Sequence, residues 1–363
     1  MRRNLVFDLI KLSIFDNADV DLESIKNMDD KSWEWSYDVL AKHGVAALVC
    51  NWLGRNAYGI TPPPDVLINF VSAETIAKRS YVKLKKIMEK LTLIMSENGI
   101  KSLLLKGFSL AAYYPQPELR IFADIDIYAP NDDRKIDGIF ASRGVPVKTH
   151  FYRHSHMKLG SIAVENHHYL LDVRGRKRFI KLDADLRNSA LIYLDSFDAP
   201  GLYYPDPYFS LIFNLHHAMS HFIYEGISLK FLVDWIYFFQ KEIAFLDSDK
   251  IGDSLREHQL LKFAAVMTEV SVRYLGLNYE IVPEYLKHEM SLLPPFVIRK
   301  FLDDLFRPYH LIRKRNFLTD RLNSVLGIIR ASWKPKIFLD QSAVVFIWNK
   351  FLAIMVGESV EAD

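Results

Sequence analysis

The sequence has a single cysteine, Cys50, among its 363 residues. One thiol cannot form an intrachain disulfide, and it rules out cysteine-rich zinc sites and iron–sulfur clusters. The composition is therefore compatible with a reducing compartment. The N-terminus begins with Arg2-Arg3, but Asp8 and Lys11 interrupt its apolar stretch too early for a signal peptide. We expect a cytoplasmic protein.

The chain also lacks a hydrophobic run long enough to cross a membrane. Its most apolar tract, residues 342–356, is interrupted by Asn349 and Lys350 and is shorter than the ~20 residues of a transmembrane helix. We interpret this tract as a buried C-terminal helix. The chain also has no large excess of charge of one sign, since 46 Lys and Arg are nearly balanced by 44 Asp and Glu. A long nucleic acid is therefore not a favoured partner, and any anionic ligand must be held by a local cluster.

Half of the residues are hydrophobic, which is enough for two or three domains with proper cores. Residues 1–64 show helix-like apolar spacing and end in three prolines, so we predict an N-terminal helical segment. Residues 65–97 read as one long amphipathic helix that Asn98-Gly99 terminates. Apolar spacing stays helical from about residue 205 onward. We predict a large C-terminal helical domain over residues 203–363.

Residues 65–202 combine helical and strand patterns, so we expect an α+β core with a small mixed sheet. Residues 100–105 predict a buried strand, which a turn at Gly107 connects to a helix over 108–114. Alternation over 120–128 predicts a second strand, and residues 131–142 predict a helix. Residues 148–159 and 162–171 predict a hairpin around the Gly160-Ser161 turn.

Two acidic residues lie on one face of the second predicted strand. Asp124 and Asp126 are two positions apart, so their side chains leave the same face while Ile125 and Ile127 point into the core. Two carboxylates this close repel unless a cation neutralises them, and hard oxygen ligands suit Mg²⁺ or Mn²⁺ completed by substrate phosphates. The pair therefore predicts a divalent metal that serves phosphoryl-type transfer.

The glycine turn before this strand predicts the other half of a nucleotide site. Gly107 lets the backbone approach a phosphate closely, and the following helix offers free N–H groups with a favourable dipole. Lys106 and Arg120 flank the turn with positive charge, and Ser109 offers a hydroxyl donor. We expect these four residues to bind the triphosphate of an NTP.

These residues resemble the signature of the uncharacterised nucleotidyltransferases in the polymerase-β-like superfamily. The resemblance rests on Leu-Leu-Leu-Lys-Gly at 103–107, on Tyr114-Pro115, and on the arginine and paired aspartates of residues 120–126. It extends over about residues 70–240. Val164-Glu165-Asn166-His167 matches a hydrophobic-Glu-x-His strand of that family, and the helices that carry His216, His217, His221 and Asp234 resemble its helical portion.

The resemblance implies that Glu165 is the third metal-site carboxylate, on a strand beside that of Asp124 and Asp126, with Asp172 as the competing candidate. One departure is that Phe108 follows Gly107, where the superfamily usually has Gly or Ser. The implied activity is metal-dependent transfer of a nucleoside monophosphate from an NTP to an unidentified acceptor, with release of pyrophosphate. The C-terminal helical domain would choose the acceptor.

Two other functions fit parts of this pattern. A glycosyltransferase also grips a nucleotide diphosphate through an Asp-x-Asp pair, but it would need a larger α/β sheet before the pair. A non-catalytic nucleotide- or partner-binding protein could keep the same fold, although the three carboxylates argue against loss of activity.

Further polar residues have both functional and structural interpretations. Alternation directs His154 and His156, or His167, toward the acids, where one could contact phosphate or act as an acid; otherwise, with His168, they are structural imidazoles. The basic run Arg174, Arg176, Lys177 and Arg178 predicts a solvated loop or a clamp for the triphosphate. His217 and His221 have a spacing that zinc accepts, but without a third ligand they predict a packing or domain-interface role.

Overall fold

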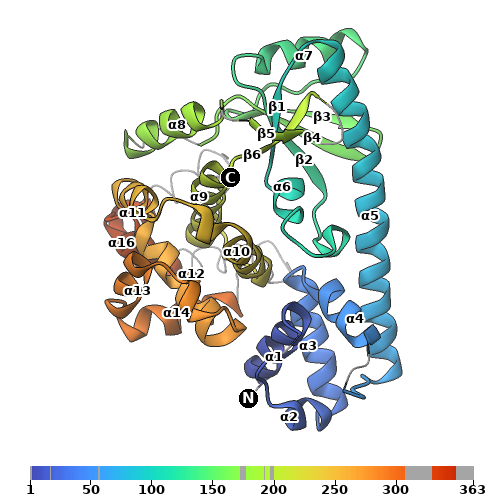
Figure 1. The fold of residues 1–363 in the computed structure, drawn as a ribbon, viewed down its shortest axis with the longest axis vertical. Coiled ribbons are helices and arrows are strands. Elements are labelled where there is room, and N and C mark those ends of the chain that lie inside the picture. Colours follow the sequence, from blue (N-terminus) through green and yellow to red (C-terminus); the bar gives the residue numbers. More distant parts are fainter. Residues whose placement is uncertain are drawn as a thin grey trace. The chain divides into compact units, whose positions relative to one another are not determined.

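The computed structural model describes residues 2–16, 18–55, 58–171, 177–191, 193–196, 200–306 and 329–348 (Figure 1). The chain divides into two compact units. The first comprises Met1–Asn214 with Tyr237–Leu246, and the second comprises Leu215–Ile236 with Asp247–Asp363. The predicted α+β class is confirmed, because helices flank a small mixed sheet at both ends of the sequence.

The first unit begins with the expected N-terminal helices. They are α1 (Arg2–Ile14), α2 (Leu22–Lys26), α3 (Asp30–Lys42) and α4 (Ala46–Arg55). The long helix α5 (Pro64–Glu97) follows, with a proline in its first turn, where a missing N–H costs nothing. It ends at Glu97 with Asn98 as its C-cap, and Gly99 takes a φ of 63°, a left-handed conformation that glycine adopts readily. Helix α5 connects the N-terminal helices to the sheet (Figure 1).

The sheet has six strands in the order β3-β4-β2-β1-β6-β5. Pairs β1–β6 and β2–β4 are parallel, and pairs β1–β2, β3–β4 and β5–β6 are antiparallel. The strands are β1 (Ser102–Leu105), β2 (Asp124–Tyr128), β3 (His154–Leu159), β4 (Ile162–His167), β5 (Tyr193–Ser196) and β6 (Leu202–Pro205). The elements between them are α6 (Gly107–Ala111), the 3₁₀ helix η1 (Pro117–Leu119), α7 (Asp133–Ser142) and α8 (Lys177–Ser189).

One face of the sheet forms the core of the first unit. Ile125 and Ile127 of β2 and Val164 of β4 pack with buried residues of the two covering helices, Leu84, Met88, Leu91 and Met95 of α5 and Ile136 and Phe140 of α7. Side chains alternate between the two faces of a strand. The apolar positions of β2 therefore turn Asp124 and Asp126 toward the opposite face.

The predicted hairpin is present, with Gly160 at a φ of 64° in the turn between β3 and β4. Its strands are shorter than predicted, because β3 begins at His154 and β4 ends at His167. Strands β5 and β6 were not predicted. Each has only four residues, too few for alternation to be read. Strand β6 joins the sheet by pairing with β1, about a hundred residues earlier in the sequence, and β5 pairs with β6. The proposed domain boundary at residues 202–203 falls within β6, which pairs with β1.

The second unit is helical in the residues that the structure describes. Helices α9 (Pro207–Tyr224) and α10 (Leu229–Glu242) contribute to both units, and the 3₁₀ helix η2 (Ile243–Phe245) belongs to the first. The remaining helices of the second unit are α11 (Ser248–Glu257), α12 (Leu261–Leu275), α13 (Glu284–Ser291), α14 (Pro295–Leu305) and α16 (Trp333–Phe338), with the 3₁₀ helix η3 (Tyr279–Ile281). Phe222, Phe263 and Phe301 are fully buried in this unit.

Within the described ranges, no helix combines the length and apolar character that a bilayer crossing demands. The apolar tract predicted as a buried C-terminal helix is described only to residue 348. Residues 343–348 are helical, and Phe346 is buried while Val344 and Trp348 are exposed. This part is therefore not buried as a whole, because its apolar residues occupy more than one helix face.

Candidate metal and active site

Strand register brings the predicted carboxylates together. Strands β2 and β4 pair in parallel with Asp126 opposite Glu165 and Asp124 opposite Ala163. Residues opposite each other in a sheet point to the same face, so the three carboxylates share one side of it. Asp126 is buried, whereas Asp124 and Glu165 are half-buried. The competing candidate, Asp172, lies outside the described residues.

Asp126 receives two hydrogen-bond donors on one carboxylate oxygen. The Lys106 Nζ lies 3.0 Å from Asp126 Oδ1, and the His167 Nε2 lies 2.9 Å from the same atom. Burial alone would raise the pKa of Asp126, but the Lys106 charge and the bond to His167 outweigh it, so this pKa lies well below its usual range. Asp126 is therefore ionised at neutral pH.

Glu165 behaves differently from the aspartate opposite it. Burial, followed by the negative charges of Asp126 and Asp124, raises the pKa of Glu165 to about 7. A carboxyl group with this pKa exchanges its proton near neutrality. The acid pair thus resembles sites in which one carboxylate stays charged while its neighbour can carry a proton.

Three histidines lie on the same face as the acids. His154 pairs with His167 across β3 and β4, and His156 pairs with Glu165, so the predicted alternation directs all three there. The Nε2 atoms of His154 and His167 each lie 3.8 Å from a Glu165 oxygen. Burial is the main cause that lowers the pKa of His167 to about 4 and that of His154 to about 3. Both imidazoles are therefore neutral at physiological pH.

The donor atoms fit a divalent cation. Asp126, Glu165 and His167 each offer one ligand atom, and the three atoms lie within 4.8 Å of one another. Their chemistry is two carboxylate oxygens and one imidazole nitrogen, with the half-buried Asp124 two residues from Asp126 on the same face. Divalent ions in enzymes are held by such groups.

The residues predicted to bind the triphosphate build the turn between β1 and α6. Ser109 Oγ donates to the Lys106 carbonyl at 3.0 Å, and the buried Arg120 donates to the Gly107 carbonyl at 3.1 Å. A Cβ atom on Gly107 would lie 2.8 Å from Phe122 Cδ2, so the close approach of this ring requires glycine. Lys106 has a φ of 47°, uncommon for a residue with a side chain. Phosphate binding at the turn stays a prediction.

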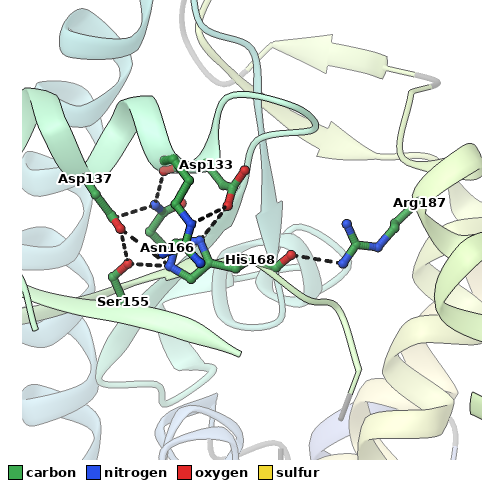
Figure 2. Close-up of polar contacts among 7 residues, drawn as sticks. Asp133, Asp137, Ser155, Asn166, His168 and Arg187 are labelled. Carbon is green, nitrogen blue, oxygen red and sulfur yellow. Dashed lines mark hydrogen bonds and ion pairs between the residues drawn. The ribbon is translucent and has the colours of Figure 1, made fainter. Parts of the chain in front are cut away.

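A polar network between α7 and the core-facing side of β3 and β4 was not predicted from the sequence (Figure 2). Asn166 donates to the Asp133 carbonyl at 2.7 Å and to the Asp137 carboxylate at 2.8 Å. Ser155 donates to Asp137, and the two ring nitrogens of His168 lie 2.6 Å from Asp133 Oδ2 and Ser155 Oγ. A signal was present, because Ser155 and Asn166 are polar residues at the core-facing positions of strands.

Other predicted polar features divide between the two units. In the second unit, His221 Nδ1 lies 3.0 Å from Glu225, and the rings of His217 and His221 are 4.5 Å apart. No metal-ligand group among the described residues includes either histidine. Four aromatic residues of α10 are buried: Trp235, Tyr237, Phe238 and Phe239. The side chains of the basic run 174–178 lie outside the described residues.

Comparison with known families decides the classification. A family described as uncharacterised nucleotidyltransferase matches residues 29–276, which include every residue of the site described above. The chain belongs to this nucleotidyltransferase family. No curated protein and no solved structure matches the chain. The resemblance seen in residues 70–240 is therefore confirmed, and the nucleotidyltransferase match extends beyond it in both directions.

Proposed function

We propose that this nucleotidyltransferase-family chain transfers a nucleoside monophosphate from an NTP to an acceptor and releases pyrophosphate. The observation that carries the proposal is the register of β2 and β4. It places Asp126 opposite Glu165, with Asp124 on the same face. Membership of this family also argues against the glycosyltransferase alternative.

Each carboxylate has a distinct role in this proposal. Asp124, Asp126 and Glu165 would hold the divalent metal, Mg²⁺ or Mn²⁺. When bound, such an ion neutralises phosphate charge and activates the attacking oxygen. Asp126 is the permanently charged member, because Lys106 and His167 hold its pKa low. Glu165, half-buried opposite Asp126, is our candidate to accept the proton of the acceptor on a carboxylate oxygen.

The two sides of β2 suggest where the two substrates bind. Lys106, Gly107, Ser109 and Arg120 lie beside β1, and we assign the triphosphate to that side, where the Lys106 ammonium is 3.0 Å from Asp126. The attacking and leaving oxygens of such a transfer lie roughly in line. The acceptor would therefore approach from the opposite side of β2, along β4 and β3.

A double-label transfer experiment tests the activity. The protein is incubated with Mg²⁺ or Mn²⁺, a heat-treated cell extract as the source of acceptors, and an NTP labelled at either the α or the γ phosphorus. We expect the α label to move to an acceptor while pyrophosphate appears, and Asp126→Asn to abolish both. Transfer of the γ label would show phosphoryl rather than nucleotidyl transfer. If Asp126→Asn still transfers the α label, the assigned site does not carry the activity.

A further inference from the structure

The candidate metal site contains nitrogen donors as well as oxygen donors. His167 is fully buried, and its Nε2 lies 2.9 Å from Asp126 and 3.8 Å from Glu165. A second imidazole, His154, has its Nε2 3.8 Å from Glu165 and its ring centroid 5.5 Å from that of His167. Both side chains therefore direct a nitrogen at Glu165, and His167 also contacts Asp126.

The separations match those between ligands of one ion. Oxygen and nitrogen ligands about 2.1 Å from a metal lie roughly 3.0 Å apart at octahedral angles and 3.4 Å apart at tetrahedral angles. The separations of His167 Nε2 from Asp126 and Glu165, 2.9 and 3.8 Å, lie on either side of these values. The third atom of the group also lies within 4.8 Å of the other two.

His154 provides an independent sign of a missing ligand. It is only 8% exposed, and its Nδ1 has no hydrogen-bond partner among the described residues. Its Nε2 lies 3.8 Å from Glu165 Oε1, which is too long for a hydrogen bond. A buried ring nitrogen without a hydrogen bond is costly, so the unpartnered Nδ1 of His154, on a ring beside Glu165, calls for an explanation.

We propose that the ion at the three carboxylates is a first-row transition-metal ion, of the class Mn²⁺, Co²⁺ or Zn²⁺. His167 is its nitrogen ligand beside Asp126 and Glu165, and His154 is a further nitrogen donor within reach. Imidazole nitrogen suits these ions, whereas Mg²⁺ prefers an all-oxygen shell. The site therefore favours a transition ion over Mg²⁺. The inference deepens the proposed function and rests on it for the presence of a metal.

A different role for His167 must be separated from metal ligation. The carboxylate of Asp126 only accepts hydrogen bonds, so a short contact to Nε2 requires a proton on that nitrogen. In that role His167 orients Asp126 and gives no nitrogen to the ion. His167→Gln separates the two roles, because the glutamine amide can donate a similar bond but offers no imidazole.

The test uses the full chain with Mn²⁺ and no nucleotide. Pulsed electron paramagnetic resonance of bound Mn²⁺ detects the ¹⁴N coupling of a coordinated imidazole. We expect this coupling in the wild-type protein, and we expect His167→Gln to abolish it and weaken Mn²⁺ binding by about tenfold or more. His288→Ala, which removes an exposed histidine of α13, is the control and leaves the spectrum unchanged.

Each outcome has a separate meaning. Bound Mn²⁺ without ¹⁴N coupling in the wild-type spectrum overturns the inference but leaves the proposed function intact, and this result needs no variant to fold. Displacement of Mn²⁺ by an equal concentration of Mg²⁺ also overturns it. If neither Mn²⁺ alone nor Mn²⁺ with NTP binds, both the inference and the proposed function fail.

Discussion

Asp126 joins three chain segments through one carboxylate oxygen. Lys106 reaches it from the end of β1 and His167 reaches it from β4, while Asp126 itself lies in the middle of β2. An ionised carboxylate in a buried position is stable only when it is paired and hydrogen-bonded. Lys106 supplies the pairing charge when no metal is bound.

The first prediction concerns this lysine. Lys106→Met removes the ammonium and leaves a buried charge with its main counterion missing, which typically costs about 3 kcal/mol or more. We expect the free energy of unfolding, measured by urea titration in EDTA, to fall by this order. Adding Mn²⁺ should stabilise the variant more than the wild-type protein, because the metal replaces the lost charge. Lys90→Met, at an exposed position of α5, is the control. Equal stability of the Lys106 variant and wild type in EDTA would refute the pairing role.

The second prediction concerns pH and Glu165. Its pKa is raised to about 7 in the folded state, from an ordinary value of 4.5, so the folded protein binds the proton more tightly than the unfolded chain. The contribution of Glu165 to the free energy of unfolding is fully present below pH 4.5 and is lost as the pH rises through about 7. Glu165→Gln stays neutral at every pH. In EDTA, urea unfolding should show little change at pH 5 and a gain of the order of 2 kcal/mol at pH 8.5. A loss of stability at pH 8.5 would contradict the prediction.

At the scale of elements, the β1–α6 turn depends on close packing. Gly107→Ala would place a methyl group 2.8 Å from the Phe122 ring, and we expect overpacking to cost about 1–3 kcal/mol of unfolding free energy. Gly138→Ala is the matched control, because nothing lies within 4 Å of a Cβ there and the position is inside α7. It should gain up to about 1 kcal/mol. Similar effects of the two substitutions would show that the Phe122 contact is not tight.

The fourth prediction concerns the attachment of β4 to α7. Asn166 is fully buried and donates to both Asp133 and Asp137, so Asn166→Ala leaves the Asp137 carboxylate without one of its donors (Figure 2). Hydrogen bonds to charged groups contribute about 1.5–3 kcal/mol, and we expect a loss of this order in urea unfolding. Asn27→Ala, which removes an exposed hydrogen bond to the Glu23 carbonyl, should change stability by less than about 0.5 kcal/mol. If Asn166→Ala lowers the free energy of unfolding no more than this control does, the network does not stabilise the attachment of β4.

Local patterns in the sequence predicted the elements that carry the site. The alternation of Asp124, Ile125 and Asp126 predicted β2 and its two faces, and the turn at Gly160 predicted the β3–β4 hairpin. The pairing of Asp126 with Glu165 was beyond such patterns, because register between strands about forty residues apart is set by tertiary packing. The bond from His167 to Asp126 and the polar network between α7 and the core-facing side of β3 and β4 depend on that register.

At the scale of the whole molecule, the family match spans parts of both compact units. The site residues all belong to the first unit, and helices α9 and α10 run through both. The near-neutral charge of the chain means that charges must be balanced locally, and in the site Lys106 pairs with Asp126. This arrangement suits an anionic nucleotide that arrives with its own cation.

The measurement that tests the account most directly is a thermal unfolding series with each NTP, in the presence and absence of Mg²⁺ or Mn²⁺. A ligand that binds only the native state raises the unfolding midpoint, and it adds about 2.7 kcal/mol at a hundredfold excess over Kd. The account predicts a rise that requires both NTP and metal and that disappears in the Asp124→Asn plus Asp126→Asn variant. No rise with any NTP, or a rise that the double variant retains, would contradict it.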